Sequence, residues 1–286
     1  MKIQIAGSYE LTADLTPGAT VEAEYGENVI EGECFTLAHH ARHYRHNPAP
    51  CLFENQPSFD GDILISHIDL DTVGGCLALY GRKPEDDAFW RGAAFIDTRG
   101  PHRIIDLPKK VQEMLYAYKA YDNAQKREKP EGLKGLVDVT DTILQHGEAV
   151  RKIISGDPGM IDAGKAWARE AEARAERVES FLVMENDYLR AFKTGNVFCN
   201  AAYYSPKLKK YIPAIVTWSR EWSNILISFE DGGEKNDASV VAAKLWGSLA
   251  GGHAGIAGSP RGLKLPEELM QREFDRAIEE VLSLFG

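Results

Sequence analysis

The fold is decided by residues 62–75, DILISHIDLDTVGG, where an apolar segment leads into an acidic one. Residues 62–67 are apolar on both faces of a pleated strand, which is typical of a central parallel strand covered on both sides. The small residues that follow predict a helix over residues 74–80. A buried strand that leads directly into a helix predicts an α/β fold with a parallel sheet.

Three candidate metal ligands, His67, Asp69 and Asp71, stand at alternate positions after this strand. If the chain stays extended, their side chains point to the same side. Carboxylate oxygens suit Mn²⁺ or Mg²⁺, and an imidazole shifts the preference toward Mn²⁺. Open α/β sheets also bind ligands at the carboxyl ends of their strands. We therefore expect a metal site, the alternative being that an aspartate only caps the helix.

Asp97 and His102 are further candidate ligands. The apolar residues 93–96 predict a second strand that ends at Asp97, and a carboxylate at the end of a neighbouring strand would complete or bridge the site. Taken alone, Asp97 is as well suited to capping a turn. His102 follows five residues later, within reach of the same site.

A histidine-dense segment, residues 37–47 (LAHHARHYRHN), holds four of the eight histidines. His39 and His40 are its candidate metal ligands, whereas His43 and His46 are expected to be exposed. Short histidine-rich tracts are compositional signals, so the segment supports a metal or phosphate site without defining one.

The chain of 286 residues is long enough for two domains, and we expect a boundary near residue 192. The expected elements are, in chain order, a small antiparallel unit with strands at 2–5 and 21–25, mostly helical residues 107–155, one long amphipathic helix over 160–192, strands at 197–200, 212–217 and 225–229, and helices at 238–245 and 266–285.

A glycine-rich segment, residues 247–258 (GSLAGGHAGIAG), places His253 among five glycines. The backbone of such a segment can approach a ligand closely, and its N–H groups can cradle an anion. Arg261 follows and would add a bidentate phosphate contact. The alternative is a flexible connection without a binding role.

The two motifs together resemble those of the DHH/DHHA1 phosphoesterase superfamily. Its first motif joins a buried strand to His-x-Asp-x-Asp and a small-residue helix start, as in residues 67–75. Its carboxy-terminal domain carries a Gly-Gly-His-x-x-Ala-Gly loop, which residues 251–258 match with one extra residue. A strand bearing Asn200 adds to the similarity. The resemblance extends over residues 195–262 and is local over residues 61–80.

The resemblance implies a DHH-like parallel-sheet domain, residues 1–192, joined by a long helix to a smaller DHHA1-like α/β domain, residues 193–286. In that family, aspartates and histidines bind two divalent cations, typically Mn²⁺, and an activated water attacks phosphorus. By matching motif, the metal ligands here would be His67, Asp69 and Asp71, and the phosphate would be held by Gly251, Gly252 and His253, with Asn200 and Arg261 as further substrate contacts.

The sequence departs from the family at one point, because no Asp-His-His triplet follows the first motif. Two replacements are open. Asp97 with His102 would take the place of the triplet, or the earlier pair His39 and His40 would fold back into the vacancy.

We therefore expect a hydrolase with one or two Mn²⁺ or Mg²⁺ ions that acts on a small phosphodiester, a short oligonucleotide or a pyrophosphate. The candidate catalytic residues are Asp71, Asp97 and His253, of which His253 would neutralise phosphate charge or protonate a leaving oxygen. The alternative is a non-catalytic nucleotide-binding or regulatory protein with a degenerate metal site.

Composition limits the partners that we expect. The formal net charge of −10 disfavours a broad grip on nucleic acid, so an exonuclease would act on short strands only, with bases stacked on Tyr203, Tyr204 or Trp218. The sequence contains no long apolar run and no secretory leader pattern, and its four cysteines suit free thiols, so we expect a cytoplasmic protein without membrane contact. A homodimer through the long helix is left open.

Overall fold

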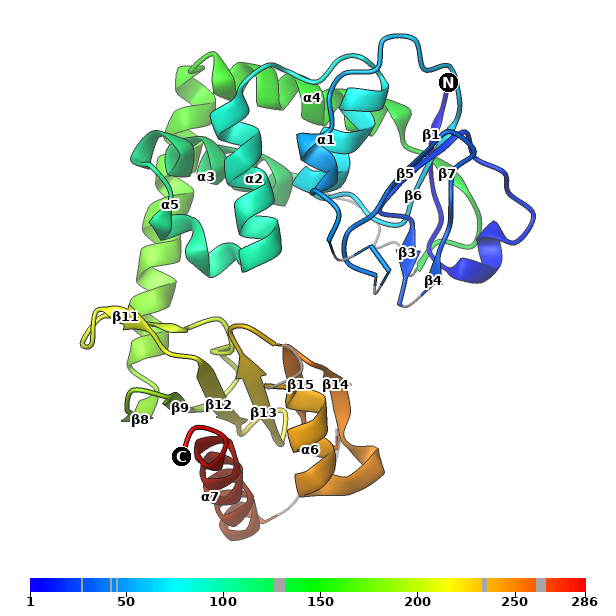
Figure 1. Cartoon of the computed structure of the whole chain (residues 1–286). Coiled ribbons are helices and arrows are strands. Elements are labelled where there is room, and N and C mark those ends of the chain that lie inside the picture. The colour runs from blue at the N-terminus through cyan, green and yellow to red at the C-terminus, as the bar shows by residue number, and fades with distance from the viewer. Residues whose placement is uncertain (27, 42, 45, 126–131, 233–235, 261–265) are drawn as a thin grey trace. The chain divides into compact units, whose positions relative to one another are not determined.

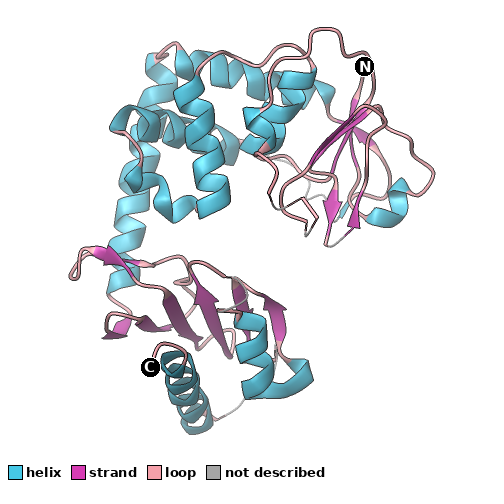
Figure 2. Ribbon diagram, viewed as in Figure 1, coloured by secondary structure: helices cyan, strands magenta, loops and turns pink. Residues whose placement is uncertain are grey.

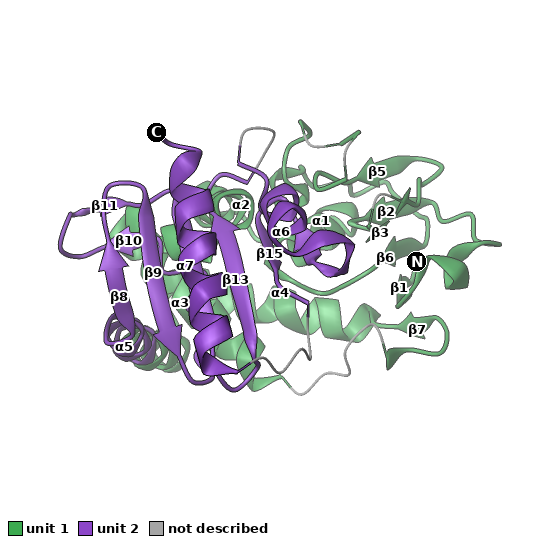
Figure 3. Ribbon diagram, turned by 90° about the horizontal axis from the view of Figure 1, so that it is seen from below, with its two compact units in different colours: residues 1–169 green, residues 170–286 purple. Residues whose placement is uncertain are grey.

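The computed structural model describes residues 1–286 except 27, 42, 45, 126–131, 233–235 and 261–265. The chain divides into compact units of residues 1–169 and 170–286, and the division falls inside the helix α5 (Pro158–Glu179), earlier than residue 192 (Figure 3). Each unit contains a β-sheet with helices packed on it, which confirms the α/β class (Figure 2). Among the helices in the described ranges, none has the length and apolar character needed to cross a membrane.

The sheet of residues 1–169 has the strand order β5-β2-β6-β1-β7, and its first four strands run parallel. Figure 1 labels β1, β5, β6 and β7 of this sheet. As residues 62–67 predicted, β6 lies at the centre. The strands are β1 (Ile3–Ile5), β2 (Ala19–Val21), β5 (Phe35–Leu37), β6 (Ile63–Ile65) and the antiparallel edge strand β7 (Val137–Asp138).

The prediction of a separate antiparallel unit at the N-terminus is wrong. Three strands of the parallel sheet, β1, β2 and β5, come from the first 60 residues. Between two strands of this region, antiparallel pairing among the described residues occurs in the short hairpin of β3 (Glu24–Tyr25) and β4 (Asn28–Val29), and β1 also pairs antiparallel with β7. The short strands at the N-terminus alternate too few residues to reveal whether their neighbours run parallel or antiparallel.

The apolar residues of β6 divide between two cores. Ile63 and Ile65 pack in one cluster with α1 (Leu70–Leu79) and α4 (Thr140–Ile154), while Leu64 packs in a second cluster with Ala6 and Ala23. This alternation is the physical reason why a central strand is apolar on both faces. A third cluster joins α1 and α4 to α2 (Asp87–Arg99), α3 (Lys109–Ala124) and the short helix η2 (Pro50–Leu52).

The strand predicted over residues 93–96 is wrong, because these residues belong to α2. The side chain of Asp86 accepts a hydrogen bond of 2.8 Å from the Phe89 N–H and caps the helix. The buried side chains of this helix recur at helical spacing: Phe89, Trp90, Ala93 and Ile96. Asp97 therefore enters the site from the last turn of a helix and not from the end of a strand.

The sheet of residues 170–286 has six strands in the order β14-β15-β13-β12-β9-β8, with α6 (Ala238–Trp246) and α7 (Glu267–Ser283) packed in its main core. The predicted strands at 212–217 and 225–229 correspond to β12 (Ala214–Ser219) and β13 (Asn224–Phe229). A smaller hairpin joins β10 (Tyr204–Ser205) to β11 (Lys210–Tyr211). The strand predicted at 197–200 is absent from the described structure, and buried Asn200 lies in a turn.

The long helix predicted over residues 160–192 ends at Glu179, and β8 (Leu182–Glu185) and β9 (Leu189–Thr194) follow it. Arg190 explains the early end. Its fully buried guanidinium donates to Glu179 Oε2 at 2.6 Å and to Glu185 Oε2 at 3.0 Å, so the strand is tied to the helix end. This buried ion network and the pairing of β8 with β9 override a spacing that is equally compatible with a continued helix.

The glycine-rich segment forms a hairpin of β14 (Gly251–His253) and β15 (Ile256–Gly258), preceded by the short helix η5 (Gly247–Leu249). Gly252 has φ of 141°, and a Cβ atom on it would lie 2.3 Å from the Cα of Ala257. Glycine is therefore required here by close strand pairing, so the segment is an ordered edge strand and not a flexible connection.

Candidate metal centre

Three neighbouring parallel strands deliver side chains to one point in residues 1–169. The strand ends Val21, Leu37 and Ile65 are register partners, so β2, β5 and β6 end side by side. The carboxyl ends of parallel strands are where such sheets bind ligands. The segments after these strands and the last turn of α2 carry seven candidate ligands, which form three overlapping groups able to hold a metal ion: Glu22 with His39 and His40, Glu22 with His67 and Asp69, and His39 with Asp71 and Asp97.

Glu22 is the functional candidate that the sequence interpretation missed. It directly follows β2, is fully buried, and belongs to two of the three groups. Its φ of 47° places it in the left-handed region, which is uncommon for a residue with a side chain and typical of functional sites. Its Oε1 lies 3.0 Å from His39 Nε2, and its Oε2 lies 3.2 Å from His67 Nε2. The sequence interpretation places Glu22 inside a strand over residues 21–25, so its position at the end of a parallel strand becomes visible only in the fold.

His39 lies at the centre of the cluster. Its Nε2 is 3.0 Å from Glu22 Oε1, 3.1 Å from Asp71 Oδ2 and 3.0 Å from Asp97 Oδ2. One imidazole N–H cannot serve three oxygens, and none of these four buried atoms has a hydrogen-bond partner among the described residues. Buried polar atoms are almost always hydrogen-bonded, so this convergence requires another explanation.

A divalent cation fits three of these atoms, because His39, Asp71 and Asp97 form one ligand group in which the two oxygens lie 3.1 and 3.0 Å from His39 Nε2. Glu22 belongs to a different group, with His39 and His40. Carboxylate oxygens with an imidazole nitrogen suit a hard cation with some affinity for nitrogen. The residues present therefore fit the metal that the sequence led us to expect.

Backbone N–H groups hold two of the carboxylates in place. The Cys51 N–H donates to Asp71 Oδ1 at 2.8 Å, and the Thr72 N–H donates to Asp69 Oδ1 at 2.8 Å. Asp69 therefore caps α1 while its Oδ2 lies 3.3 Å from His67 Nε2. The predicted cap is therefore present, and it is compatible with a role of Asp69 as a metal ligand. Because α1 begins at Leu70, Asp71 does not continue an extended segment as predicted, and it joins His39 and Asp97 instead of Asp69.

Ser66 determines which nitrogen of His67 faces the cluster. The Ser66 hydroxyl donates its one proton to the Glu22 carbonyl, and Ser66 Oγ lies 3.0 Å from His67 Nδ1. Nδ1 must then donate to Ser66, which leaves the lone pair of Nε2 for a ligand when the ring is neutral. Such a second contact is what metal-binding histidines ordinarily have.

Without a cation, protons on the imidazoles balance the carboxylates. Burial disfavours a charged His39, but its contacts with Asp71, Asp97 and Glu22 outweigh burial and raise its pKa to about 12. Burial likewise opposes the charge of His67, and its contacts with Asp69 and Glu22 raise its pKa to about 10. Burial raises the pKa of Asp71 despite its contact with His39. A cation that binds here therefore displaces protons.

The two other histidine predictions have different outcomes. His40 lies at the edge of the cluster, with its Nε2 3.4 Å from Glu22 Oε1 and 3.5 Å from Asp97 Oδ2 and its side chain 48% exposed. His102 lies in the short helix η3 (Pro101–Asp106) and belongs to none of the ligand groups found among the described residues. The fold therefore brings together His39 and His40 from one predicted replacement and Asp97 from the other, while His102 is in none of the groups among the described residues.

The predicted phosphate contacts lie in residues 170–286. Gly251, Gly252 and His253 are exposed on β14, and His253 Nδ1 accepts a hydrogen bond of 3.2 Å from the Gly255 N–H. Asn200 is buried, and its amide donates to Ser228 Oγ at 3.3 Å on β13. Arg261 lies outside the described residues. Tyr203 and Trp218 are buried in the two cores of this unit, so they are unsuited to stacking a base, while Tyr204 is 37% exposed.

No protein-family model matches the sequence, and no curated protein matches it. Among solved structures, an exopolyphosphatase-related protein from Bacteroides fragilis is similar at 12% identity and a TM-score of 0.30, over 78% of this chain and 61% of that one. An uncharacterized protein from Helicobacter pylori G27 is similar at 13% identity and a TM-score of 0.25, over 68% and 53%. The chain thus spans less than two thirds of either protein. Scores this low carry no argument about fold or activity.

Proposed function

We propose that the protein is a metal-dependent phosphohydrolase related to the DHH/DHHA1 superfamily. The proposal depends mainly on the convergence of Glu22 Oε1, Asp71 Oδ2 and Asp97 Oδ2 on His39 Nε2 at 3.0–3.1 Å without a hydrogen bond among the described residues. Such an arrangement is costly unless a cation occupies it. The His-x-Asp-x-Asp motif of residues 67–71 at the same point adds the resemblance on which the reaction class depends.

Two ions suit the cluster better than one. The cluster holds four carboxylates, Glu22, Asp69, Asp71 and Asp97, so its charge with neutral imidazoles is −4. One dication would leave −2, which repels a phosphate, whereas two dications would bring the sum to 0. Glu22 offers one oxygen toward His39 and the other toward His67, so it would bridge two ions held by different groups. The nitrogen ligands favour Mn²⁺ over Mg²⁺.

Bound divalent cations would lower the pKa of water and neutralise charge on a phosphoryl group. The contribution of the chain itself is orientation. The Cys51 N–H fixes Asp71, the Thr72 N–H fixes Asp69, and Ser66 fixes the ring of His67. Glu22, His39 and Asp71 are buried, which shields their ligand atoms from bulk water and strengthens the electrostatic interactions between them.

We infer that residues 38–40, Ala-His-His, take the place of the missing Asp-His-His triplet. They follow β5, which pairs with β2, and β2 pairs with β6, so the histidines reach the motif of β6 from two strands away. The carboxylate that the triplet would supply is then provided by Glu22 or by Asp97.

The glycine hairpin is proposed as the phosphate-binding element of residues 170–286. Because His253 Nδ1 accepts from the Gly255 N–H, the proton of the neutral ring lies on Nε2 of an exposed side chain. An Nε2–H can donate to a phosphate oxygen. His253 would then neutralise phosphate charge or supply a proton to a leaving oxygen.

The test is Mn²⁺-dependent hydrolysis of bis(p-nitrophenyl) phosphate, the dinucleotide pApA and inorganic pyrophosphate. Asp71→Asn is the diagnostic variant, and Glu33→Gln, which changes an exposed carboxylate of the same unit, is the matched control. Turnover that requires both Mn²⁺ and Asp71, and survives in the control, is the expected result. Mn²⁺ binding without turnover on any of the three would favour the non-catalytic nucleotide-binding or regulatory protein.

A further inference from the structure

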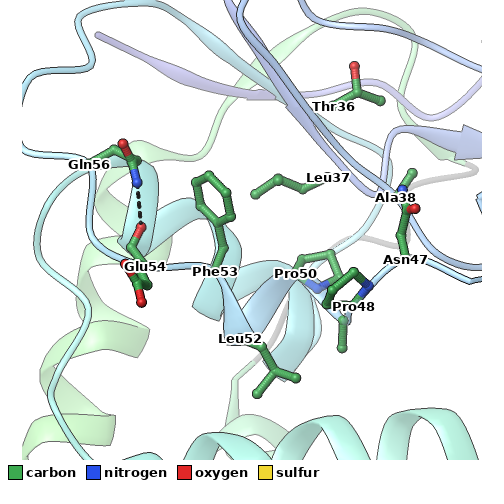
Figure 4. A pocket seen from close by; sticks show the side chains of 11 residues that line it. Thr36, Leu37, Ala38, Asn47, Pro48, Pro50, Leu52, Phe53, Glu54 and Gln56 are labelled. Atoms are coloured by element: carbon green, nitrogen blue, oxygen red, sulfur yellow. Dashed lines mark hydrogen bonds between the residues drawn. The ribbon is translucent and has the colours of Figure 1, made fainter.

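A cavity of about 410 Å³ lies beside β5 and is bounded by the segment that contains η2 (Figure 4). None of its lining residues is one of the seven candidate metal ligands. Its volume falls within the usual range for small-molecule sites, about 300–1,000 Å³. The cavity is therefore large enough for an organic group, and the proposed reaction at the metal centre does not account for it.

The walls of the cavity are apolar and rigid. Pro48 and Pro50 form one part, and the ring of Phe53 lies beside Leu37 in another (Figure 4). Phe53 is also held edge-on against Phe35, with ring centroids 5.5 Å apart. Proline and phenylalanine offer flat faces with little conformational freedom, which suits a planar ring better than a flexible chain.

Lys83 holds the wall segment in place. Its ammonium group donates to the Cys51 carbonyl at 2.9 Å and to the Phe53 carbonyl. These two bonds fix the backbone on either side of Leu52. The cavity is therefore preformed, which lowers the entropy that a ligand loses on binding.

The charge of the described lining disfavours a phosphate. Among the described residues, the eleven that line the cavity include no lysine, arginine or histidine, and Glu54 contributes the one ionisable side chain, an acidic one. The remaining polar lining groups are three. The Thr36 hydroxyl accepts a hydrogen bond of 3.1 Å from the Gly32 N–H, and the Gln56 carboxamide donates to the Glu54 carbonyl at 3.2 Å, so the exposed carboxamide of Asn47 is the group best placed to meet a ligand. A carboxamide presents a donor and an acceptor side by side, which matches the edge of a nucleobase. The lining suits an uncharged, hydrogen-bonding ring.

Two chain segments connect the cavity to the metal centre. Ala38 lines the cavity and His39, the next residue, is the central candidate ligand. Pro50 lines the cavity and the next residue, Cys51, donates its N–H to Asp71. Consecutive Cα atoms are about 3.8 Å apart, so the cavity and the metal centre are neighbours.

We propose that this cavity binds the nucleobase of a phosphorylated substrate. Binding of the substrate's phosphate at the metal centre rests on the proposed function, while binding of its nucleobase rests on the cavity alone. The substrate class is accordingly a nucleotide ester, such as a short oligonucleotide or a nucleotide diester, and inorganic pyrophosphate would leave the cavity empty.

Binding of the nucleobase can be tested without metal and without turnover. Ligand-observed NMR with millimolar adenosine, guanosine, cytidine and uridine measures binding to the metal-free protein, with ribose as the compound that lacks a base. Leu52→Trp is the blocking variant, because Leu52 lines the cavity and is 39% exposed. Leu269→Trp, at a leucine of residues 170–286 that is 42% exposed, is the matched control.

We expect at least one nucleoside to bind and ribose not to bind. Leu52→Trp should lower the affinity for that nucleoside by about fivefold or more, whereas Leu269→Trp should leave the affinity unchanged. Asn47→Ala should weaken the same nucleoside, because it removes the carboxamide at the rim. The proposal is overturned if no nucleoside binds, or if both tryptophan variants weaken binding equally.

The outcome also separates the base site from the phosphohydrolase. Nucleoside binding that is intact in Asp71→Asn, together with absent Mn²⁺-dependent turnover in the native protein, would remove the proposed reaction and keep the base site. Conversely, Leu52→Trp should lower kcat/KM for pApA and leave the hydrolysis of pyrophosphate unchanged. Equal loss on both substrates would refute the base site and keep the reaction.

Discussion

Replacement of Glu22 by glutamine should weaken Mn²⁺ binding more than replacement of any one ligand of the His-x-Asp-x-Asp motif, residues 67–71. Glu22 belongs to two of the three ligand groups, whereas Asp69 belongs to one. Each of these groups has three members, so Glu22→Gln leaves two ligands in two groups, and Asp69→Asn leaves two ligands in a single group. The glutamine keeps the shape of the side chain and removes the charge that a cation needs.

The expected magnitude follows from the metal ligands of other proteins. Loss of a residue that only orients a ligand costs about 10–100-fold in affinity, so loss of a ligand itself should cost about 100-fold or more, equal to about 2.8 kcal/mol. Because Glu22 faces His39 with one oxygen and His67 with the other, both ions should be weakened. Asp69→Asn should weaken one ion and leave the other near its native affinity.

The assay is calorimetric titration of Mn²⁺ into metal-free protein, which reports stoichiometry and affinity together. Free Mn²⁺ can be followed in parallel by its paramagnetic resonance signal. Glu33→Gln is the matched control, since it neutralises an exposed carboxylate. The reasoning is refuted if Glu22→Gln binds the same number of ions as the native protein with an affinity within about threefold of it.

Three further predictions concern the scaffold. Gly252→Ala should lower the free energy of unfolding by about 1–3 kcal/mol in a urea titration, because φ is 141° and the added methyl overlaps the paired strand; Gly251→Ala, with open space at its Cβ, should not. Arg190→Met should cost about 3–5 kcal/mol, because it leaves the buried carboxylate of Glu185 without its cation, whereas exposed Arg220→Met should cost under about 1 kcal/mol. Burial raises the pKa of three of the four thiols, so native protein should show one fast-reacting thiol, Cys34, toward a disulfide reagent, and a rise from about pH 7 to pH 9 should add none.

The elements that could be predicted from the sequence are those with a clear local pattern of apolar residues. β6 has Ile63, Leu64 and Ile65 buried in succession, and no other element type accounts for so short an apolar run before a helix cap. The helices α6 and α7 and the strands β12 and β13 were likewise recognisable from spacing alone. Their boundaries differ from the predicted ones by a few residues at most.

The secondary-structure predictions were wrong where the same residues fit both a helix and a strand. Residues 93–96 are consecutive and apolar, which suits a buried strand, but the cap at Asp86 lies seven residues earlier and starts a helix that includes them. Residues 180–192 continue a helical spacing, yet the buried guanidinium of Arg190 needs Glu179 and Glu185 close to it. In both cases a contact outside the local window decides the structure.

Glu22 could not be predicted for a different reason. Its role depends on β2 lying beside β6, a pairing between residues that are more than 40 positions apart. A glutamate after a three-residue strand carries no signal of its own. The fold shows that β2 is parallel to β6 and ends in register with it. Glu22 then lies at the carboxyl end of a parallel strand, where a metal ligand is expected.

The missing triplet also takes on a different meaning once the sheet order is known. A motif that follows β6 in sequence is one way to supply histidines and a carboxylate, but the site requires only that the supplying strands end beside β6. β2 and β5 do so, since Val21, Leu37 and Ile65 are in register, although both strands precede β6 in the chain. Under the proposed function, the ligand set would be rearranged in order, with seven candidate ligands from four segments. On this argument a degenerate site is the weaker alternative, and a native protein that binds fewer than two Mn²⁺ ions would restore it.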